Sequence, residues 1–330
     1  MKNTSLEASD SGAGWSPGSP NKTEKLQRVR IGISSCLLGE RVRFDGGHKR
    51  DAFLADMFGR YVEWVPVCPE FEVGLGVPRE TLRLVANDGR VRLISPQTGV
   101  DHTDRMKSWA EHRIEELANL DLCGYVFKRS SPSCGQRVKV YRNTGLLHRN
   151  GTGLYATAVM ERFANLPTEE EGRLNDPRLR ENFVSSVFSY KRWLDLGTRR
   201  PTRATVMGFH ARHKFLLMAH SQAGVRILGN LVAAETEYFM TFCEVMRRTP
   251  TRRNHTNVLQ HLSGYFSKRL DSHDRAELAE LIESYRRGLI PLIVPLTLIR
   301  HYVRKYGVTY LEDQVYLNPH PDELMLLNEL

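Results

Sequence analysis

The sequence contains no apolar run approaching the roughly 20 residues that a membrane-spanning helix needs, and its polar N-terminus lacks the apolar core of a signal peptide. Both absences predict a cytoplasmic protein. Cysteine is scarce, with 5 among 330 residues. These are too few and too scattered for a disulfide framework, and thiols that stay reduced are available to metals.

What the chain has in excess is positive charge. The formal net charge is +9 and the sequence pI is about 9.4. This balance biases the surface towards polyanions, with nucleic acid as the first candidate, although many basic proteins bind none. A length of 330 residues is sufficient for two domains with ample cores.

The hydrophobic pattern divides the chain into parts of different class. Residues 1–26 are rich in Ser, Gly, Asn and Pro, which predicts a disordered tail. Residues 27–196 alternate strand and helix patterns, as βαβ units do, and predict an α/β domain with a Rossmann-like open sheet. Residues 197–204 have the Gly, Pro and charge content of a linker. Residues 205–330 show only helical spacing and predict an all-α bundle.

Several elements are specific enough to be checked. The pattern predicts a hairpin over 82–93 that turns at 87–89, and helices over 51–61, 103–120, 153–163 and 177–194. In the helical part, residues 205–234 read as a single long helix, followed by shorter ones.

Three cysteines stand just past short apolar runs that read as buried strands, and they are Cys36, Cys68 and Cys134. Because the carboxyl ends of neighbouring parallel strands meet at one crevice, these thiols are expected to form one site. A structural zinc would need a fourth ligand, for which His48 is a candidate. An iron–sulfur cluster on three cysteines would leave one iron open to substrate. A lone catalytic thiolate would leave two cysteines unexplained, whereas Cys123 and Cys243 are expected to be core residues.

Polar side chains close to these cysteines are candidates for catalysis or substrate binding. Glu70, two residues after Cys68, is positioned to act as a general acid or base, with a solvated loop carboxylate as the alternative. Asp45 is a candidate substrate ligand, although Asp-Gly is also a strong turn signal. Further candidates surround the third cysteine, and they are Lys128, Arg129, Ser130, Ser131 and Ser133. The hydroxyls of the three serines could instead cap their own loop.

The predicted helical part carries four arginines around a proline turn, and they are Arg247, Arg248, Arg252 and Arg253. Like charges cannot neutralise one another, so contacts with a phosphate backbone are a candidate role, because polyanion binding releases counterions. An earlier charge run, HARHK at 210–214, is expected to be a solvated face instead.

Separated motifs occur in order along the first part, namely ISSCLLG at 33–39, RFDG at 43–46, VCPE at 67–70 and KRSSPSCG at 128–135. Together they resemble the thiouracil desulfidase (TudS) family over residues 28–194, and the acidic stretch EEEGRLND at 169–176 belongs to the same resemblance. The region from FHARHK at 209–214 to YLNPHP at 316–321 resembles the YbgA-like helical domain, which is often fused to this desulfidase domain.

The resemblance implies a [4Fe-4S] cluster on Cys36, Cys68 and Cys134, and removal of sulfur from a thiolated pyrimidine without net redox change. Fused chains of this kind resemble the tRNA 4-thiouridine desulfidases (RudS), which implies conversion of 4-thiouridine in tRNA to uridine and hydrosulfide. Two positions depart from the family pattern. Many relatives have another cysteine where this chain has Val42, and a tyrosine where it has Phe44. The first cysteine loop therefore offers no second thiol.

The mechanism expected from this resemblance uses three groups. The iron without a cysteine would polarise the C–S bond, Glu70 would take the proton of an attacking water, and Ser131 or a neighbouring hydroxyl would orient the pyrimidine. The helical part would hold RNA through phosphate contacts. Two alternatives are a desulfidase for free thiouracil or a thiouridine nucleotide, and an iron–sulfur redox sensor that binds nucleic acid and transforms nothing.

Overall fold

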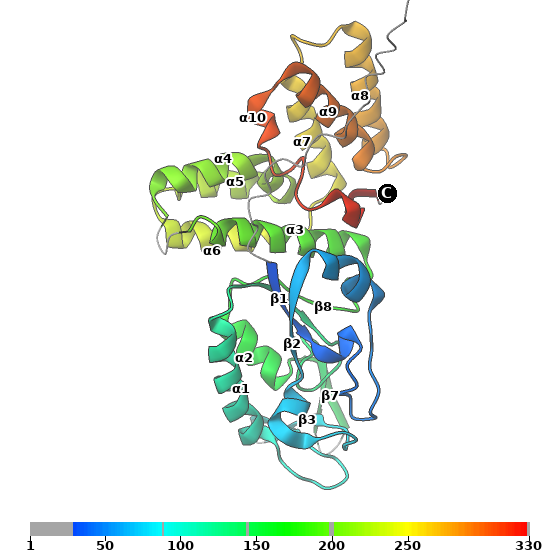
Figure 1. The fold of residues 1–330 in the computed structure, drawn as a ribbon, viewed down its shortest axis with the longest axis vertical. Helices are drawn as coiled ribbons and strands as arrows, with labels where there is room; N and C mark the ends of the chain where they lie inside the picture. The colour runs from blue at the N-terminus through cyan, green and yellow to red at the C-terminus, as the bar shows by residue number, and fades with distance from the viewer. Residues whose placement is uncertain (1–28, 88, 143–144, 198–200, 329–330) are drawn as a thin grey trace, which may run out of the picture.

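The structure is a computed structural model that describes residues 29–87, 89–142, 145–197 and 201–328. Within these ranges the N-terminal part contains two four-stranded sheets, and the C-terminal part is helical (Figure 1). The predicted disordered tail and residues 198–200 of the predicted linker lie outside the described residues. Among the helices described, none combines the length and the apolar character of a membrane span.

The first sheet is parallel throughout, with strand order β2-β1-β5-β8. Its strands are β1 (Val29–Ser34), β2 (Val62–Val67), β5 (Leu122–Phe127) and β8 (Thr168–Glu170). Every residue of β5 is buried, because a central parallel strand is covered by helices on both faces and is apolar along its whole length. The predicted open parallel sheet, followed by a helical region, is confirmed.

Three helices cover this sheet, and they are α1 (Thr103–Ala118), α2 (Leu154–Arg162) and α3 (Pro177–Leu194). Tyr125 and Phe127 of β5 pack with residues of α1 and α2 on one face. On the other face, Ile31 and Ile33 of β1 pack with Val184 and other residues of α3. Cys123 is buried in this second cluster, and Cys243 is buried in the helical part, as predicted.

The second sheet has the order β4-β3-β6-β7. Its strands are β3 (Arg83–Asn87), β4 (Arg90–Ile94), β6 (Val138–Arg142) and β7 (Gly145–Gly151). β3 and β4 form the predicted hairpin, and β3 pairs with β6 in parallel. One face carries Leu84, Leu93, Val138 and Val140, which pack with Met106 of α1.

The C-terminal part consists of helices, and they are α4 (Arg203–His220), α5 (Gln222–Asn230), α6 (Glu235–Met246), α7 (Arg252–Gly264), α8 (Ser272–Arg286), α9 (Ile293–Tyr306) and α10 (Thr309–Glu312). The prediction of one helix over 205–234 is wrong. Ser221 adopts an extended conformation, and its side chain accepts a hydrogen bond from the backbone N–H of Gly224 at the start of α5. The chain therefore ends one helix and begins another at this residue.

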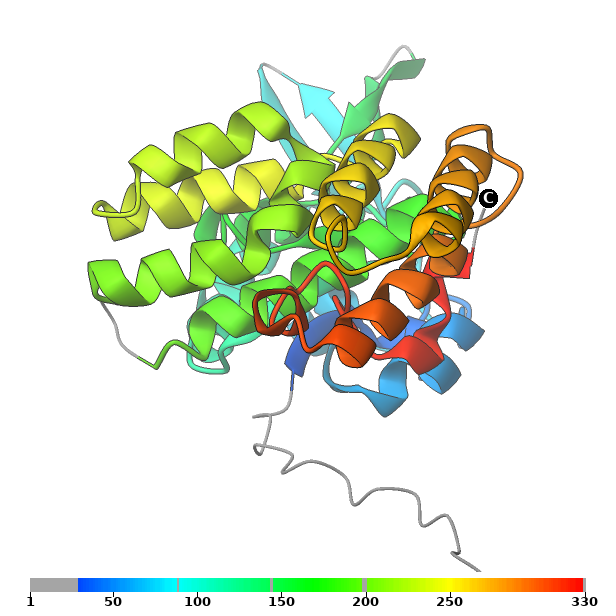
Figure 2. The same ribbon diagram turned by 90° about the horizontal axis from the view of Figure 1, so that it is seen from above.

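Helix α3 carries contacts between the two parts, and it lies between the first sheet and the C-terminal helices in Figure 1. The ring of Trp193 in α3 stacks on Tyr238 and Phe239 of α6, with centroid distances of 5.6 and 4.9 Å. Leu324 and Leu326, from the C-terminal segment, pack into the core that contains β1. Seen from above, the C-terminal helices lie over the N-terminal sheets (Figure 2). The predicted domain boundaries stay a prediction, and side-chain contacts cross them.

Candidate functional site

The three cysteines at the strand ends line one cavity of about 390 Å³. Cys36 lies in a short helical turn directly after β1, Cys68 directly follows β2, and Cys134 lies in the loop after β5. Because β1 lies between β2 and β5, these are the carboxyl ends of three adjacent strands. Cys36 and Cys134 are buried and Cys68 is partly buried.

The electrostatics of these thiols favour a cationic centre between them. Burial raises the pKa of Cys36 to about 12 and that of Cys68 to about 11, and it raises the pKa of Cys134 well above the ordinary value. For Cys36 and Cys134, repulsion from a charged Cys68 adds to the effect of burial. Three such thiolates need compensating positive charge, which a metal centre would provide.

The spacing of the thiols favours a cluster over a single zinc ion. Thiolates held at about 2.3 Å around one tetrahedral zinc lie roughly 3.8 Å apart. Among the described residues, the three Sγ atoms do not all lie within 4.8 Å of one another. His48, the candidate fourth ligand of a zinc site, does not line the cavity, and its Nδ1 accepts a hydrogen bond from the backbone of Arg50.

Glu70 lies in this cavity and is held by three side chains. Arg79 donates to its Oε2 from Nη2 at 2.6 Å and from Nε at 3.0 Å. The hydroxyls of Ser131 and Ser133 donate to its Oε1 at 3.3 and 3.0 Å. The side chains of Arg79 and Glu70 are only 7% and 14% exposed. The two charge-assisted hydrogen bonds from Arg79 therefore fix the orientation of the carboxylate beside the cysteines.

The loop that carries Cys134 is ordered by its own serines and by two carboxylates. The Ser131 oxygen accepts hydrogen bonds from the backbone N–H groups of Ser133 and Cys134. Glu171 accepts from the backbone of Arg129 and from the ammonium of Lys128. Glu170, directly before it, accepts from the backbone N–H groups of Gln136 and Arg137. Glu170 and Glu171 therefore hold the cysteine loop at both of its ends through hydrogen bonds.

The structure brings together most of the candidate residues predicted from the sequence. The cavity is lined by Glu70, Lys128, Arg129, Ser130 and Ser131 in addition to the three cysteines. Two candidates, Asp45 and Ser133, do not line the cavity. Asp45 is exposed, accepts from the backbone of Gly47 and pairs with Arg43, so it forms the turn. Ser133 is 0% exposed and faces Glu70. Neither is placed to contact a substrate in this cavity.

The four arginines of the helical part lie at the end of α6 and the start of α7. Arg247 donates to the carbonyl oxygen of Ala164, Arg248 donates to Ser221, and the Arg252 guanidinium lies 6.0 Å from the ring centroid of Tyr285. Within the described ranges none of the four pairs with a carboxylate. They remain exposed cations without an assigned ligand.

Sequence reasoning missed Arg79, and it missed the roles of Glu170 and Glu171. Arg79 follows Glu70 by nine residues across an irregular segment, and no periodic pattern links them. The acidic run was identified in the sequence only as part of the family resemblance, but Glu170 ends β8, the edge strand beside β5. The burial of Glu170, which is only 2% exposed, is what indicates its role, since a buried carboxylate must be hydrogen-bonded.

Comparison with known proteins adds to this geometry. Residues 31–171 match the family described as 2-thiouracil desulfurase, and residues 214–321 match the family described as protein of unknown function DUF1722. Uncharacterized protein YbgA of Escherichia coli strain K12 is 34% identical over 158 residues, which are 45% of this chain and 94% of YbgA. A solved structure described as [4Fe-4S]-dependent thiouracil desulfidase TudS is 26% identical, with a TM-score of 0.37, and the match covers 46% of this chain and 97% of that one. The chain therefore belongs to the family of YbgA, with a 2-thiouracil desulfurase domain at residues 31–171 and a DUF1722 domain at residues 214–321.

Proposed function

We propose that this protein is a desulfidase that removes sulfur from a thiolated pyrimidine and holds a [4Fe-4S] cluster on Cys36, Cys68 and Cys134. The observation that carries the proposal is the convergence of three thiols from three adjacent strand ends on one cavity of about 390 Å³, within the residues that match the desulfurase family. We further propose 4-thiouridine in tRNA as the substrate, with uridine and hydrosulfide as products.

When bound, the cluster would supply an iron without a cysteine ligand, which suits the soft sulfur of a thiocarbonyl group. The overall reaction adds water to the carbon that carries sulfur and expels hydrosulfide, so it needs no oxidant or reductant. Glu70 is the base for this reaction. Its carboxylate lies in the cavity, and its four hydrogen bonds occupy its four lone-pair sites, so it takes the proton of an attacking water that displaces one of the serine hydroxyls from Oε1.

Ser131 positions Glu70, which differs from the role expected for it. Its single hydroxyl proton is donated to Glu70, and its oxygen already accepts two backbone N–H groups. It therefore has no donor left for a pyrimidine. Ser130 is the better hydroxyl for that role, because it is exposed and lines the cavity.

The first test is made on protein purified and reconstituted anaerobically with iron and sulfide. We expect hydrosulfide release from a 4-thiouridine substrate, and loss of both iron and turnover in Cys36→Ser, Cys68→Ser and Cys134→Ser. Cys243→Ser is the matched control, because Cys243 is a buried cysteine of the helical part. Full iron retention in all three cysteine variants would overturn the assignment of the cluster ligands.

The role of Glu70 is tested separately with Glu70→Gln, which keeps the size of the side chain. We expect iron content to be retained and turnover to fall by at least about 100-fold, the usual contribution of a general base. A variant that turns over at the wild-type rate would remove Glu70 from the reaction, and the cluster assignment would still stand.

A further inference from the structure

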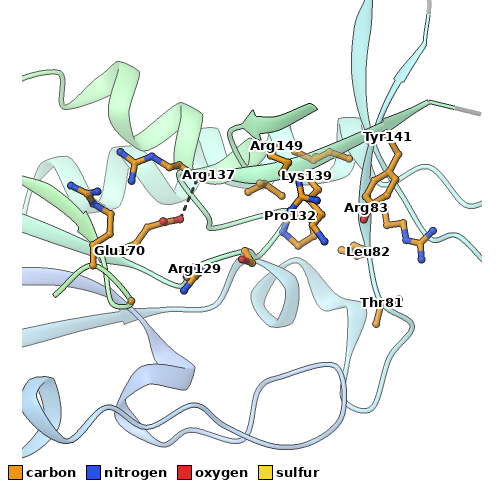
Figure 3. Close-up of a pocket in the computed structure, with 15 residues that line it drawn as sticks. Thr81, Leu82, Arg83, Arg129, Pro132, Arg137, Lys139, Tyr141, Arg149 and Glu170 are labelled. Carbon is orange, nitrogen blue, oxygen red and sulfur yellow. Dashed lines mark hydrogen bonds between the residues drawn. The ribbon is translucent and has the colours of Figure 1, made fainter. Parts of the chain in front are cut away.

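A second cavity, larger than the cysteine cavity at about 640 Å³, is shown in Figure 3. The two cavities share five lining residues, which are Thr81, Leu82, Arg129, Ser130 and Pro132. A ligand that fills the larger one therefore reaches the loop that carries Cys134. We call the larger cavity the basic groove, for the residues described next.

The basic groove is lined by six cationic side chains. Five of them form no ion pair with a carboxylate among the described residues, and they are Arg83, Arg129, Arg137, Lys139 and Arg149. All five are exposed. A sixth, Arg173, pairs with Glu169. The lining includes one carboxylate, Glu170, which is buried and already accepts two backbone N–H groups, so it neutralises none of the five.

The strand pattern of the second sheet explains why these charges gather. Along β6, Val138 and Val140 point into the core, so Lys139 and Tyr141 lie on the opposite face. β3 runs alongside in register, with Leu84 opposite Val140, which places Arg83 on the same open face. The Arg83 guanidinium lies 5.1 Å from the centroid of the Tyr141 ring, and Figure 3 shows both beside Lys139 and Arg149.

The other end of the basic groove is formed by the cysteine loop. Arg129 passes over Gly172, where an added Cβ would lie 2.9 Å from the Arg129 Cδ. The absence of a side chain at position 172 leaves room for Arg129 in this position. Arg129 lines both cavities, so positive charge extends from the sheet to the rim of the cysteine site.

The kind of ligand follows from charge and shape. Cations gathered in one groove, with no carboxylate partner among the described residues, repel one another until an anion binds, and charges closer than a Debye length of about 8 Å are only partly screened. Five cations exceed what one phosphate group neutralises, and they are spread over three strands and the loop between β5 and β6. The pair formed by Tyr141 and Arg83 offers a flat surface on which a nucleobase can stack. A polynucleotide strand satisfies both features.

We propose that the basic groove binds the phosphodiester backbone of an RNA strand and that this strand delivers its thiolated pyrimidine to the cysteine cavity. The inference rests on the proposed function and refines it, because it assigns the substrate to a polymer and places its binding site on the second sheet. The RNA contacts expected from the sequence lay instead on the arginines of the helical part.

The test uses the full-length holoprotein and the double variant Arg83→Gln/Lys139→Gln. The substrates are a single-stranded RNA with one 4-thiouridine, 4-thiouridine 5′-monophosphate and 4-thiouridine nucleoside. We expect KM for the RNA to rise at least about 10-fold and turnover of the nucleoside to be unchanged. Since each lost phosphate contact lowers the salt slope by about 0.7 for single strands, the slope of log KM against log salt should fall by about 1.4. Lys139→Arg alone should behave as wild type, because the charge is kept.

Three outcomes would overturn the proposal. One is an unchanged KM and salt slope in the double variant, with the loss appearing instead in Arg252→Gln/Arg253→Gln, which would place the RNA on the helical part. Another is an equal loss on the monophosphate and on the RNA, which would make the groove a single-phosphate site. A third is an unchanged circular dichroism spectrum together with lost nucleoside turnover, which would mean that these side chains act on the cysteine site.

Binding of unmodified oligouridine, measured by fluorescence anisotropy, separates this proposal from the proposed function. Salt-dependent binding that weakens in the double variant supports the groove even if no substrate releases sulfide. Turnover of the nucleoside without any binding of oligouridine would leave the desulfidase in place and reject the groove.

Discussion

The ion pair between Arg79 and Glu70 permits a quantitative test of how the site is held. Both side chains are nearly enclosed, at 7% and 14% exposure, and two hydrogen bonds of 2.6 and 3.0 Å join them. Removal of one partner of such a buried pair leaves the other charge without compensation, which costs about 3–5 kcal/mol. Arg79→Leu is therefore expected to lower the free energy of unfolding by about that amount, far more than an exposed Arg–carboxylate pair would.

The assay is urea unfolding of the cluster-free protein, with Arg79→Leu, Glu70→Gln and the double variant compared in one cycle. Because the double variant contains no uncompensated charge, it should be more stable than the sum of the two single losses predicts, by at least about 2 kcal/mol. Arg50→Leu is the matched control, because its ion pair with Asp56 lies on the surface, and it should cost less than about 1 kcal/mol. Additive losses from the two single variants, within about 0.5 kcal/mol, would refute the coupling that the hydrogen bonds imply.

Three further predictions concern other parts of the molecule. Burial lowers the pKa of His213 to about 3, so below pH 6.5 the unfolded chain takes up a proton that the folded chain does not. The free energy of unfolding should therefore fall by about 1.4 kcal/mol for each pH unit below 6.5. A urea midpoint that is the same at pH 5 and pH 7 would contradict this. Gly153→Val should impair iron retention, because its Cβ would lie 2.5 Å from the carbonyl carbon of Ser133, whereas Gly208→Ala, with open space around it, should not. Ser221→Ala should lower the melting temperature through loss of a helix cap worth about 1 kcal/mol, and an unchanged melting curve would show that the break in the helix does not depend on this cap.

Residues close to the strand ends were predictable from the sequence, and the reason is geometric. A parallel sheet fixes where its strands end, so three cysteines after three apolar runs converge without further information. Helix α3 was predicted at its observed bounds, Pro177–Leu194. Asp176 accepts hydrogen bonds from the first turn, and a proline at the first helical position suits the helix start.

What could not be predicted depends on long-range contacts. The serines after β5 look equivalent in the sequence, yet Ser133 and Ser131 hold Glu70 while Ser130 faces the cavity. The positive charge of the second sheet was counted in the net charge, but its location depends on the pairing of β3 with β6 across more than fifty residues. A charge total carries no information on which face of a sheet the charges share.

The return of the C-terminal segment to the N-terminal core has a consequence for synthesis of the protein. Leu324 and Leu326 pack with β1, whose residues leave the ribosome almost three hundred residues earlier. Until the segment arrives, the core beside β1 and α3 remains open to water and to chaperones, so the first sheet cannot reach its final stability during translation. A nascent chain stalled before residue 324 should therefore be more susceptible to proteolysis near β1 than the released protein.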